Sequence, residues 1–310
     1  MIRIVGKRGK GPIDFQLDEA ARSVDFMKID CTSDNVDENM KALSPFHLGP
    51  VACYDGLRSE TFERAWQCAK VYPWLADAAG NPSASYFRWR DEMWATKGFH
   101  SKVEIRFPAG RGNSGKCLYA WWKVNGAFQK LGYVEARKEI YIPLYAKAVA
   151  ETDAFRRLCR LRDEGRSLLL LDFDGYNIHH PWYNFTYNDA IHCPLLKMGH
   201  GFVLAMMLEG LITVEGGEVH YAEGLMTPPN RTWPVDLRKV PPELLRLRNA
   251  KRLGVTPEEF DTLDAETRTW LYHASEKKTI QVRGFTKAGW KRLPLEEKLT
   301  WREDGRGGRT

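Results

Sequence analysis

The chain has 310 residues, of which 43% are hydrophobic, 28% charged and 12% aromatic. This apolar content excludes an intrinsically disordered protein and predicts one large or two small globular domains. The six scattered cysteines form no CxxC pair and no close Cys/His group, which argues against a zinc ribbon and a disulfide framework. We therefore expect no metal and no cofactor.

Hydrophobic periodicity predicts an alternation of short strands and helices. In chain order the pattern predicts strands at 2–5 and 24–29, helices at 58–75 and 86–96, strands at 102–107, 118–124 and 139–142, a helix at 144–164, a strand at 168–173 and a helix at 195–212. Asn125-Gly126 predicts a hairpin turn after the 118–124 strand. Thr256-Pro257 marks the start of a further helix, and no internal repeat is apparent.

Neither a membrane span nor a secretory signal is expected. The longest apolar stretch, residues 195–212, is interrupted by Lys197, His200 and Glu209. A membrane-spanning helix needs about 20 mostly apolar residues, so we expect no membrane partner. The basic N-terminal residues precede no apolar signal segment, and a cytoplasmic location is the simplest expectation.

The positive charge is concentrated near the end of the chain. Residues 238–310 hold 17 Lys and Arg against 11 Asp and Glu, which accounts for the whole formal net charge of +6. Lys and Arg neutralise phosphates and release counterions, so this region is a candidate for binding nucleic acid. The alternative is an ordinary solvated helical surface of mixed charge.

A polar stripe on the 58–75 helix is the most informative local feature. Glu63, Gln67 and Lys70 stand at positions i, i+4 and i+7, which places an acid, an amide and a base on one helix face. Their neighbours Phe62 and Trp66 are apolar. A buried charge is costly unless it is paired, so the stripe lies either at a solvated edge or in a cavity.

Two carboxylates lie at the end of the predicted strand at 168–173. Asp172 and Asp174 lie at the carboxyl end of this strand, where α/β proteins usually build their sites. A metal site would add His179 or His180, but the spacing favours a structural turn capped by a carboxylate.

Two glycine-rich segments are candidates for binding phosphate. Gly199-His200-Gly201 opens an apolar helix, so its backbone N–H groups either cradle a phosphate or the glycines allow close helix packing. Gly110 to Lys116 has the spacing of a phosphate-binding loop, but Cys117 replaces the Ser or Thr that would hold Mg²⁺. A predicted strand follows, so we interpret this segment as a hairpin loop.

Together these motifs resemble the NADAR superfamily, whose name refers to NAD and ADP-ribose. The family pattern runs L-S-N-F, a D-G turn, E-x-x-x-Q-x-x-K on a helix, and G-x-N-x-L-G opening an apolar helix. The chain departs from it at Pro45, Arg64, Gly201 and Leu204. The matching residues, within positions 41–212, are Leu43, Ser44, Phe46, Asp55, Gly56, Glu63, Gln67, Lys70 and Gly199.

The resemblance implies an N-glycosidase acting on a nucleotide or on an ADP-ribosylated substrate. Glu63 would be the key carboxylate of an oxocarbenium-like transition state, with Asp172 or Asp174 supplying a second one. Gln67 would bond the ribose or base, and Lys70 would hold a phosphate or tune Glu63. The remaining expected substrate contacts are Tyr54, Gly56, Trp66, Trp182, Gly199, His200 and Gly201, with the aromatic residues stacking on the base.

Two other classes of function remain open at this point. A transferase that modifies a nucleotide or nucleic-acid base, including by ADP-ribosyl transfer, would use the same cavity with an acceptor in place of water. A non-catalytic nucleic-acid-binding protein would rely on residues 238–310 instead. The oligomeric state is left open.

The expected architecture is an α+β fold in three parts. Residues 1–40 form an N-terminal strand and loop segment packed on the core. Residues 41–225 form a helix-rich, NADAR-like catalytic domain with a small antiparallel sheet or hairpin. Prolines between residues 226 and 242 mark a boundary, and residues 226–310 form a basic, mostly helical C-terminal region.

Overall fold

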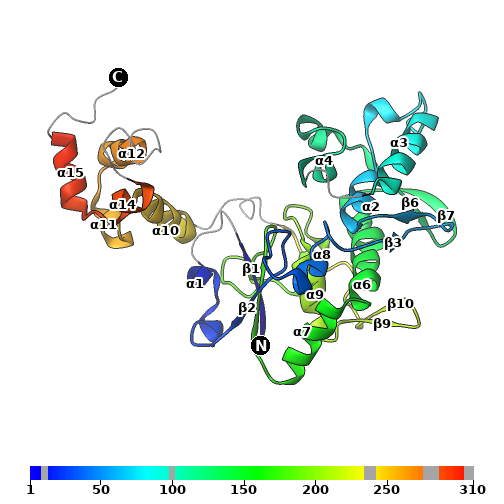
Figure 1. The fold of residues 1–310 in the computed structure, drawn as a ribbon, viewed down its shortest axis with the longest axis horizontal. Coiled ribbons are helices and arrows are strands. Elements are labelled where there is room, and N and C mark those ends of the chain that lie inside the picture. Colours follow the sequence, from blue (N-terminus) through cyan, green and yellow to red (C-terminus); the bar gives the residue numbers. More distant parts are fainter. Residues whose placement is uncertain (8–12, 98–101, 234–241, 275–285, 304–310) are drawn as a thin grey trace. The chain divides into compact units, whose positions relative to one another are not determined.

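The computed structural model describes all residues except 8–12, 98–101, 234–241, 275–285 and 304–310, and it divides into two compact units (Figure 1). The first unit consists of the described residues of Met1–Lys7 and Leu17–Arg238. The second consists of those of Arg8–Gln16 and Lys239–Thr310. No described helix combines the length and the apolar character that crossing a membrane requires.

A parallel three-stranded sheet forms the centre of the first unit. Its order is β1 (Ile2–Gly6), β8 (Leu168–Asp172) and β2 (Met27–Asp30). Ile4 and Ile29 both pair with Leu170 on the middle strand. The continuous leucine run of β8 suits a strand covered on both faces. All three strands end at one edge, next to the candidate site.

The other sheets are small and antiparallel, which confirms the α+β class. The largest joins β5 (Lys70–Val71), β6 (Tyr119–Val124) and β7 (Ala127–Leu131). The predicted turn at Asn125-Gly126 is confirmed, since both residues have the positive φ that this hairpin requires. Two further hairpins pair β3 (Val51–Ala52) with β4 (Arg58–Ser59), and β9 (Ile212–Glu215) with β10 (Glu218–Tyr221).

Helices and short turns surround these sheets. The helices of the first unit are α2 (Phe62–Cys68), α3 (Ala84–Ala95), α4 (Lys102–Arg106), α5 (Tyr133–Ala136), α6 (Ile142–Ala150), α7 (Asp153–Asp163), α8 (Tyr187–His192) and α9 (His200–Leu208). A π-helical segment, Arg137–Tyr141, joins α5 to α6. Short 3₁₀ turns occupy Glu19–Ala21, Glu38–Leu43, Pro73–Leu75 and Arg111–Lys116.

Two predicted strands are helical in the structure. Residues 102–107 alternate in sequence, yet Lys102–Arg106 forms α4 and buries Ile105. Such a short run matches helix and strand patterns equally well, and the packing of Ile105 decides between them. Residues 139–142 are also helical, and consecutive burial of Ile140, Tyr141 and Ile142 is not the alternation of a one-faced strand.

Other predicted boundaries shift because of capping residues. Thr61 rather than Ser59 caps α2, and Thr152 caps α7, so the single helix expected at 144–164 is two helices. The helix expected at 195–212 is shorter, since it spans only His200–Leu208 and a strand begins at Ile212.

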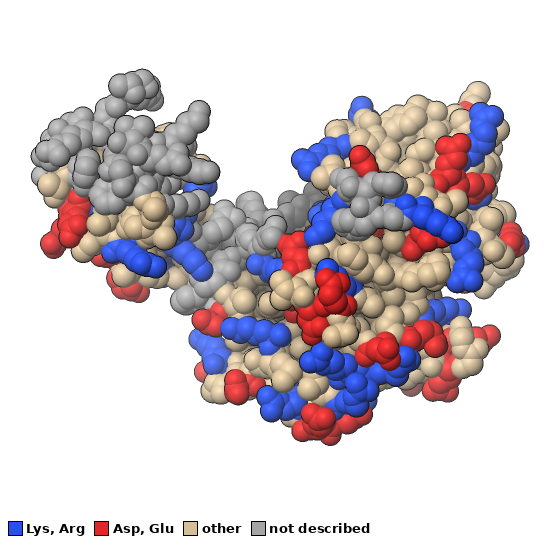
Figure 2. Space-filling view, viewed as in Figure 1, with Lys and Arg blue, Asp and Glu red and all other residues tan. Residues whose placement is uncertain are grey.

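The second unit is helical. Its elements are α1 (Ile13–Gln16), α10 (Pro242–Leu253), α11 (Pro257–Thr262), α12 (Ala265–Ala274), α14 (Lys287–Arg292) and α15 (Leu295–Glu303). Some of its basic residues make internal contacts, such as the ion pair between Arg246 and Asp261 at 2.5 Å. Figure 2 shows acidic and basic side chains interspersed over the described part of the visible face. These observations favour a surface of mixed charge.

The second unit contains a helical hairpin that occurs twice, which the sequence analysis missed. Thr256, Leu263 and Glu266 recur thirty residues later as Thr286, Leu293 and Glu296. Both threonines cap the first helix of a hairpin from extended backbone, and both leucines end that helix in extended backbone.

A basic residue occupies the same place in both hairpins. Arg268 donates to the backbone carbonyl of Asp261, and Lys298, thirty residues later, donates to that of Lys291. Lys298 is fully buried and also donates to the carbonyls of Gly254 and Leu293. The few identities are spread too thinly to reveal this repeat without the structure.

Candidate functional site

A cavity of about 350 Å³ lies in the first unit at the carboxyl edge of the parallel sheet. It brings together Glu63 and Gln67 of α2, Lys70 of β5, the end of β8 and the start of α9. The helix expected at 58–75 ends at Cys68, so Lys70 belongs to the strand that follows it. The predicted site residues on its wall are Glu63, Trp66, Gln67, Lys70, Asp172, Asp174, Gly199 and His200. Segments more than a hundred residues apart in sequence therefore meet here.

Glu63, Gln67 and Lys70 form a hydrogen-bonded chain along the cavity wall. Gln67 Nε2 donates to Glu63 Oε1 at 2.8 Å, and Lys70 Nζ donates to Gln67 Oε1 at 2.5 Å. These two hydrogen bonds fix the orientation of the Gln67 amide, with its nitrogen toward Glu63 and its oxygen toward Lys70. The chain links a carboxylate to an ammonium group without direct contact between them.

Burial shifts the acid and the base of this chain in opposite directions. Desolvation raises the pKa of Glu63, although the hydrogen bond from Gln67 and the charge of Lys70 oppose the shift. Desolvation likewise lowers the pKa of Lys70, and the Glu63 carboxylate opposes that shift. Both shifts arise because a buried charge loses its hydration. Opposed shifts of this kind are common at functional sites.

Aromatic side chains form the neighbouring wall. Trp66 lies under Lys70, with the ammonium nitrogen 5.1 Å from its ring centroid, and meets Tyr141 edge to face at 5.0 Å. Burial raises the pKa of the Tyr141 phenol well above its ordinary value, and the nearby Asp172 and Glu63 carboxylates add to the effect. Its hydroxyl is therefore protonated at neutral pH and available to donate.

Asp172 occupies the N-terminal end of α9, where the sequence suggested a phosphate. The backbone N–H of Gly201 donates to Asp172 Oδ2 at 2.9 Å. A Cβ atom at Gly199 would lie 2.1 Å from the same oxygen, and one at Gly201 would lie 3.1 Å from it. The glycines therefore allow close approach of β8, which is the second of the two interpretations given above. Gly201 does not line the cavity.

His200 is also held by internal contacts. Its Nε2 lies 2.7 Å from the carbonyl oxygen of Cys31, which can only accept, so Nε2 carries a proton. Its Nδ1 lies 3.4 Å from Asp172 Oδ2. The imidazole thus connects β8 to the segment after β2 while one face contributes to the cavity wall.

Asp174 lies at the mouth of the cavity between two cations. Its Oδ2 is 4.0 Å from Arg106 Nη2, and its Oδ1 is 3.8 Å from Lys197 Nζ. Its backbone N–H donates to Asp172 Oδ1, so the turn after β8 fixes both aspartates. All three charged side chains at the mouth are partly or largely exposed.

Besides Gly201, three of the predicted substrate contacts lie outside the cavity lining. Tyr54 packs edge to face against Trp122 and Phe128, at 4.8 and 5.2 Å, and its hydroxyl accepts a hydrogen bond from Arg90. Gly56 has φ 76° in the turn between β3 and β4. Trp182 packs on the hydrophobic core. These residues therefore stabilise the fold: the two aromatic rings pack against other side chains, and Gly56 forms a turn.

The sequence analysis missed several residues of the cavity wall. Tyr133, Arg137 and Tyr141 line it at a spacing of four, a helical pattern that the predicted strand at 139–142 concealed. Arg137 is buried and donates to two carbonyls at the end of α8 and to those of Cys193 and Leu196 between α8 and α9, which fixes that segment. Arg106 and Lys197 carried no sequence signal at all.

The glycine-rich segment Gly110 to Lys116 is not a hairpin loop. It follows α4 and forms a 3₁₀ turn before β6, and neither a preceding strand nor a following helix supports a phosphate-binding loop. Its residues Ser114 and Gly115 nevertheless line the cavity. The segment therefore forms part of the cavity wall, but not as the phosphate-binding loop that its glycine spacing resembles.

The described residues contain no group of three or more His, Cys, Asp or Glu side chains placed to hold a metal ion. His180 instead accepts a hydrogen bond from the backbone of Trp182, and His179 is exposed, so neither joins Asp172 and Asp174. No protein-family model, curated protein or solved structure matches the chain.

Proposed function

We propose that the first unit is an N-glycosidase-like hydrolase that cleaves the N-glycosidic bond of a ribosylated nucleotide or of an ADP-ribosylated base. The observation that carries this proposal is the buried chain of Glu63, Gln67 and Lys70 on the wall of a cavity with an aromatic side. The resemblance of the same residues to the NADAR pattern supports it.

The geometry suits stabilisation of an oxocarbenium-like transition state. Glu63 presents a carboxylate that Gln67 holds in one orientation, so it needs no reorganisation when positive charge develops at the anomeric carbon. Its second oxygen is available to accept a proton from water. Lys70, through Gln67, favours the ionised carboxylate over the neutral acid.

The surrounding residues suit a nucleoside. Trp66 and Tyr141 offer aromatic surface for a base, as stacking requires. The Tyr141 hydroxyl is a neutral donor for a sugar or base oxygen. Asp172 is committed to α9 and His200, so Glu63 is the carboxylate assigned to the reaction.

Incubation with ADP-ribosylated nucleotide or DNA, followed by mass spectrometry of the products, tests the proposal. Release of ADP-ribose by the wild type, with the nucleotide or DNA left unmodified, and loss of this release in Glu63→Gln would support it. Glu92→Gln is the matched control because Glu92 is an exposed residue of α3. Equal activity of wild type and Glu63→Gln would contradict the proposal.

A further inference from the structure

We propose that Arg106 and Lys197 form a phosphate subsite at the mouth of the cavity, and that Asp174 occupies it until a substrate phosphate displaces the carboxylate. This inference rests on the proposed function and deepens it, because it assigns the residues that select a phosphate-bearing substrate. It also gives Asp174 a different role from the catalytic one expected from the sequence.

The geometry at the mouth is that of a loosely held anion site. Asp174 faces one cation with each oxygen, at 4.0 Å from Arg106 and 3.8 Å from Lys197. Charge-assisted hydrogen bonds are about 2.7–2.9 Å long, so neither contact is a close one. One carboxylate stands between two cations, which leaves a net positive charge for a dianionic phosphate to neutralise.

The other anion-binding groups of the cavity are already engaged. The N-terminal end of α9 holds the Asp172 carboxylate. Lys70 donates to Gln67, and Arg137 donates to backbone carbonyls. Among the described cations that line the cavity, Arg106 and Lys197 are the pair without a close charge-assisted hydrogen bond.

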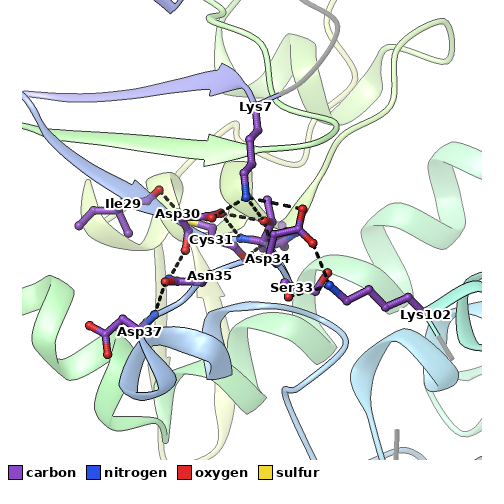
Figure 3. A network of polar contacts seen from close by, with 11 residues as sticks. Lys7, Ile29, Asp30, Cys31, Ser33, Asp34, Asn35, Asp37 and Lys102 are labelled. Carbon is purple, nitrogen blue, oxygen red and sulfur yellow. Dashed lines mark hydrogen bonds and ion pairs between the residues drawn. The ribbon is translucent and has the colours of Figure 1, made fainter. Parts of the chain in front are cut away.

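The position of Arg106 is fixed by a polar network on the same helix. Lys102, one turn before Arg106 on α4, donates to the carbonyl of Ser33 and to Asp34 Oδ1, both at 2.8 Å. Figure 3 shows Lys102 reaching toward the segment after β2, next to Asp30 at the end of that strand, to which Lys7 donates. Ser33 lines the cavity, so this network holds α4 against the cavity wall. Lys102 is therefore a positioning residue for the subsite.

Displacement of Asp174 is expected to cost little. Its side chain is 36% exposed, and those of Arg106 and Lys197 are 38% and 69% exposed. Ion pairs this exposed contribute little to stability because water screens them. A phosphate with more charge and more acceptor oxygens therefore competes effectively for both cations.

Titration calorimetry with inorganic pyrophosphate tests the subsite without relying on catalysis. We expect Arg106→Ala and Lys197→Ala each to weaken binding about tenfold, and Asp174→Asn to tighten it severalfold because the competing carboxylate is gone. Lys116→Ala is the control, since Lys116 is exposed nearby but does not line the cavity. Thermal melting of each variant confirms that it is folded.

The outcomes separate this inference from the proposed function. Weaker or unchanged binding by Asp174→Asn, or unchanged binding by both cation variants, overturns the subsite whatever the enzyme's activity. If the affinities of the variants for pyrophosphate change as expected but no ribosylated substrate is cleaved, the result supports the subsite and contradicts the proposed hydrolase function. With an active enzyme, Asp174→Asn should lower KM and keep kcat, whereas a catalytic Asp174 would lose kcat.

Discussion

Glu63→Gln should lower activity by about 10²-fold or more without reducing stability. The variant keeps an oxygen in the place of Oε1, so Gln67 still donates to it, but the negative charge is lost. A general acid/base or charge-stabilising group contributes about 10²-fold or more to rate, which equals about 2.7 kcal/mol of transition-state stabilisation. Single-turnover release of ADP-ribose, measured beside Glu92→Gln, gives this number directly.

The stability of the same variant follows from the burial of Glu63. A hydrogen bond to a charged group is stronger than a neutral one by about 1 kcal/mol, and this difference is lost in the variant. The pKa of Glu63 is nevertheless raised, which means that desolvation of the carboxylate outweighs that bond. We therefore expect the variant to be at least as stable as the wild type at neutral pH.

The pH dependence gives the sign of this effect. The pKa of Glu63 in the folded state lies above its ordinary value of 4.5, so its contribution to stability is fully present below pH 4.5 and is lost as pH rises through the folded-state pKa. The Tm of Glu63→Gln relative to that of the wild type should therefore rise between pH 4.5 and the folded-state pKa of Glu63. At higher pH the Tm of the variant should stay above that of the wild type. A variant that melts well below the wild type at neutral pH, or that retains turnover within a few-fold, would refute the reasoning.

Three further predictions concern other contacts in the two units. Lys70→Met should move the acidic limb of the kcat/KM profile to higher pH, because the ammonium group lowers the pKa of Glu63; an unmoved limb would contradict this. Gly199→Ala should lower the free energy of unfolding by about 1–3 kcal/mol in denaturant titrations, since its Cβ would lie 2.1 Å from Asp172. Lys298→Met should lower the Tm of the second unit, because the carbonyls of Gly254 and Leu293 lose the donor that the buried Lys298 supplies, a loss of about 1–3 kcal/mol.

Matched substitutions separate these effects from general damage. Gly112→Ala meets no atom within 4 Å of its Cβ, so it should leave unfolding unchanged. Lys251→Met changes an exposed lysine of α10 and should leave the Tm unchanged. Loss of stability in these controls equal to that of the test variants would contradict the assigned contacts.

Local sequence patterns predicted the parts of the site that depend on one element. The spacing of Glu63, Gln67 and Lys70 predicted one polar helix face, and the structure joins the three side chains in one chain, although only Glu63 and Gln67 lie on α2 and Lys70 begins β5. The leucine run before Asp172 predicted a buried strand, and β8 is that strand. Both features follow from the periodicity of helices and strands, which sequence displays directly.

Features that depend on contacts between distant segments could not be predicted. The role of Gly199 and Gly201 depends on Asp172, which reaches them only when β8 and α9 pack together. Arg106 reaches the cavity because residues 102–106 are helical, and a five-residue alternation does not distinguish helix from strand. Tyr54 looked like a stacking residue, but its neighbours in the folded chain use its ring in packing.

Hydrolysis in water labelled with heavy oxygen tests the central claim most directly. The wild type should cleave an ADP-ribosylated nucleotide or base into ADP-ribose and the unmodified nucleotide or base, and should place one heavy oxygen atom on the ribose carbon that was bonded to the base. Glu63→Gln should do both about 10²-fold more slowly or not at all, while remaining folded. Release of base with transfer of the ribosyl group to an acceptor and no heavy oxygen, or equal labelling by wild type and Glu63→Gln, would contradict the account.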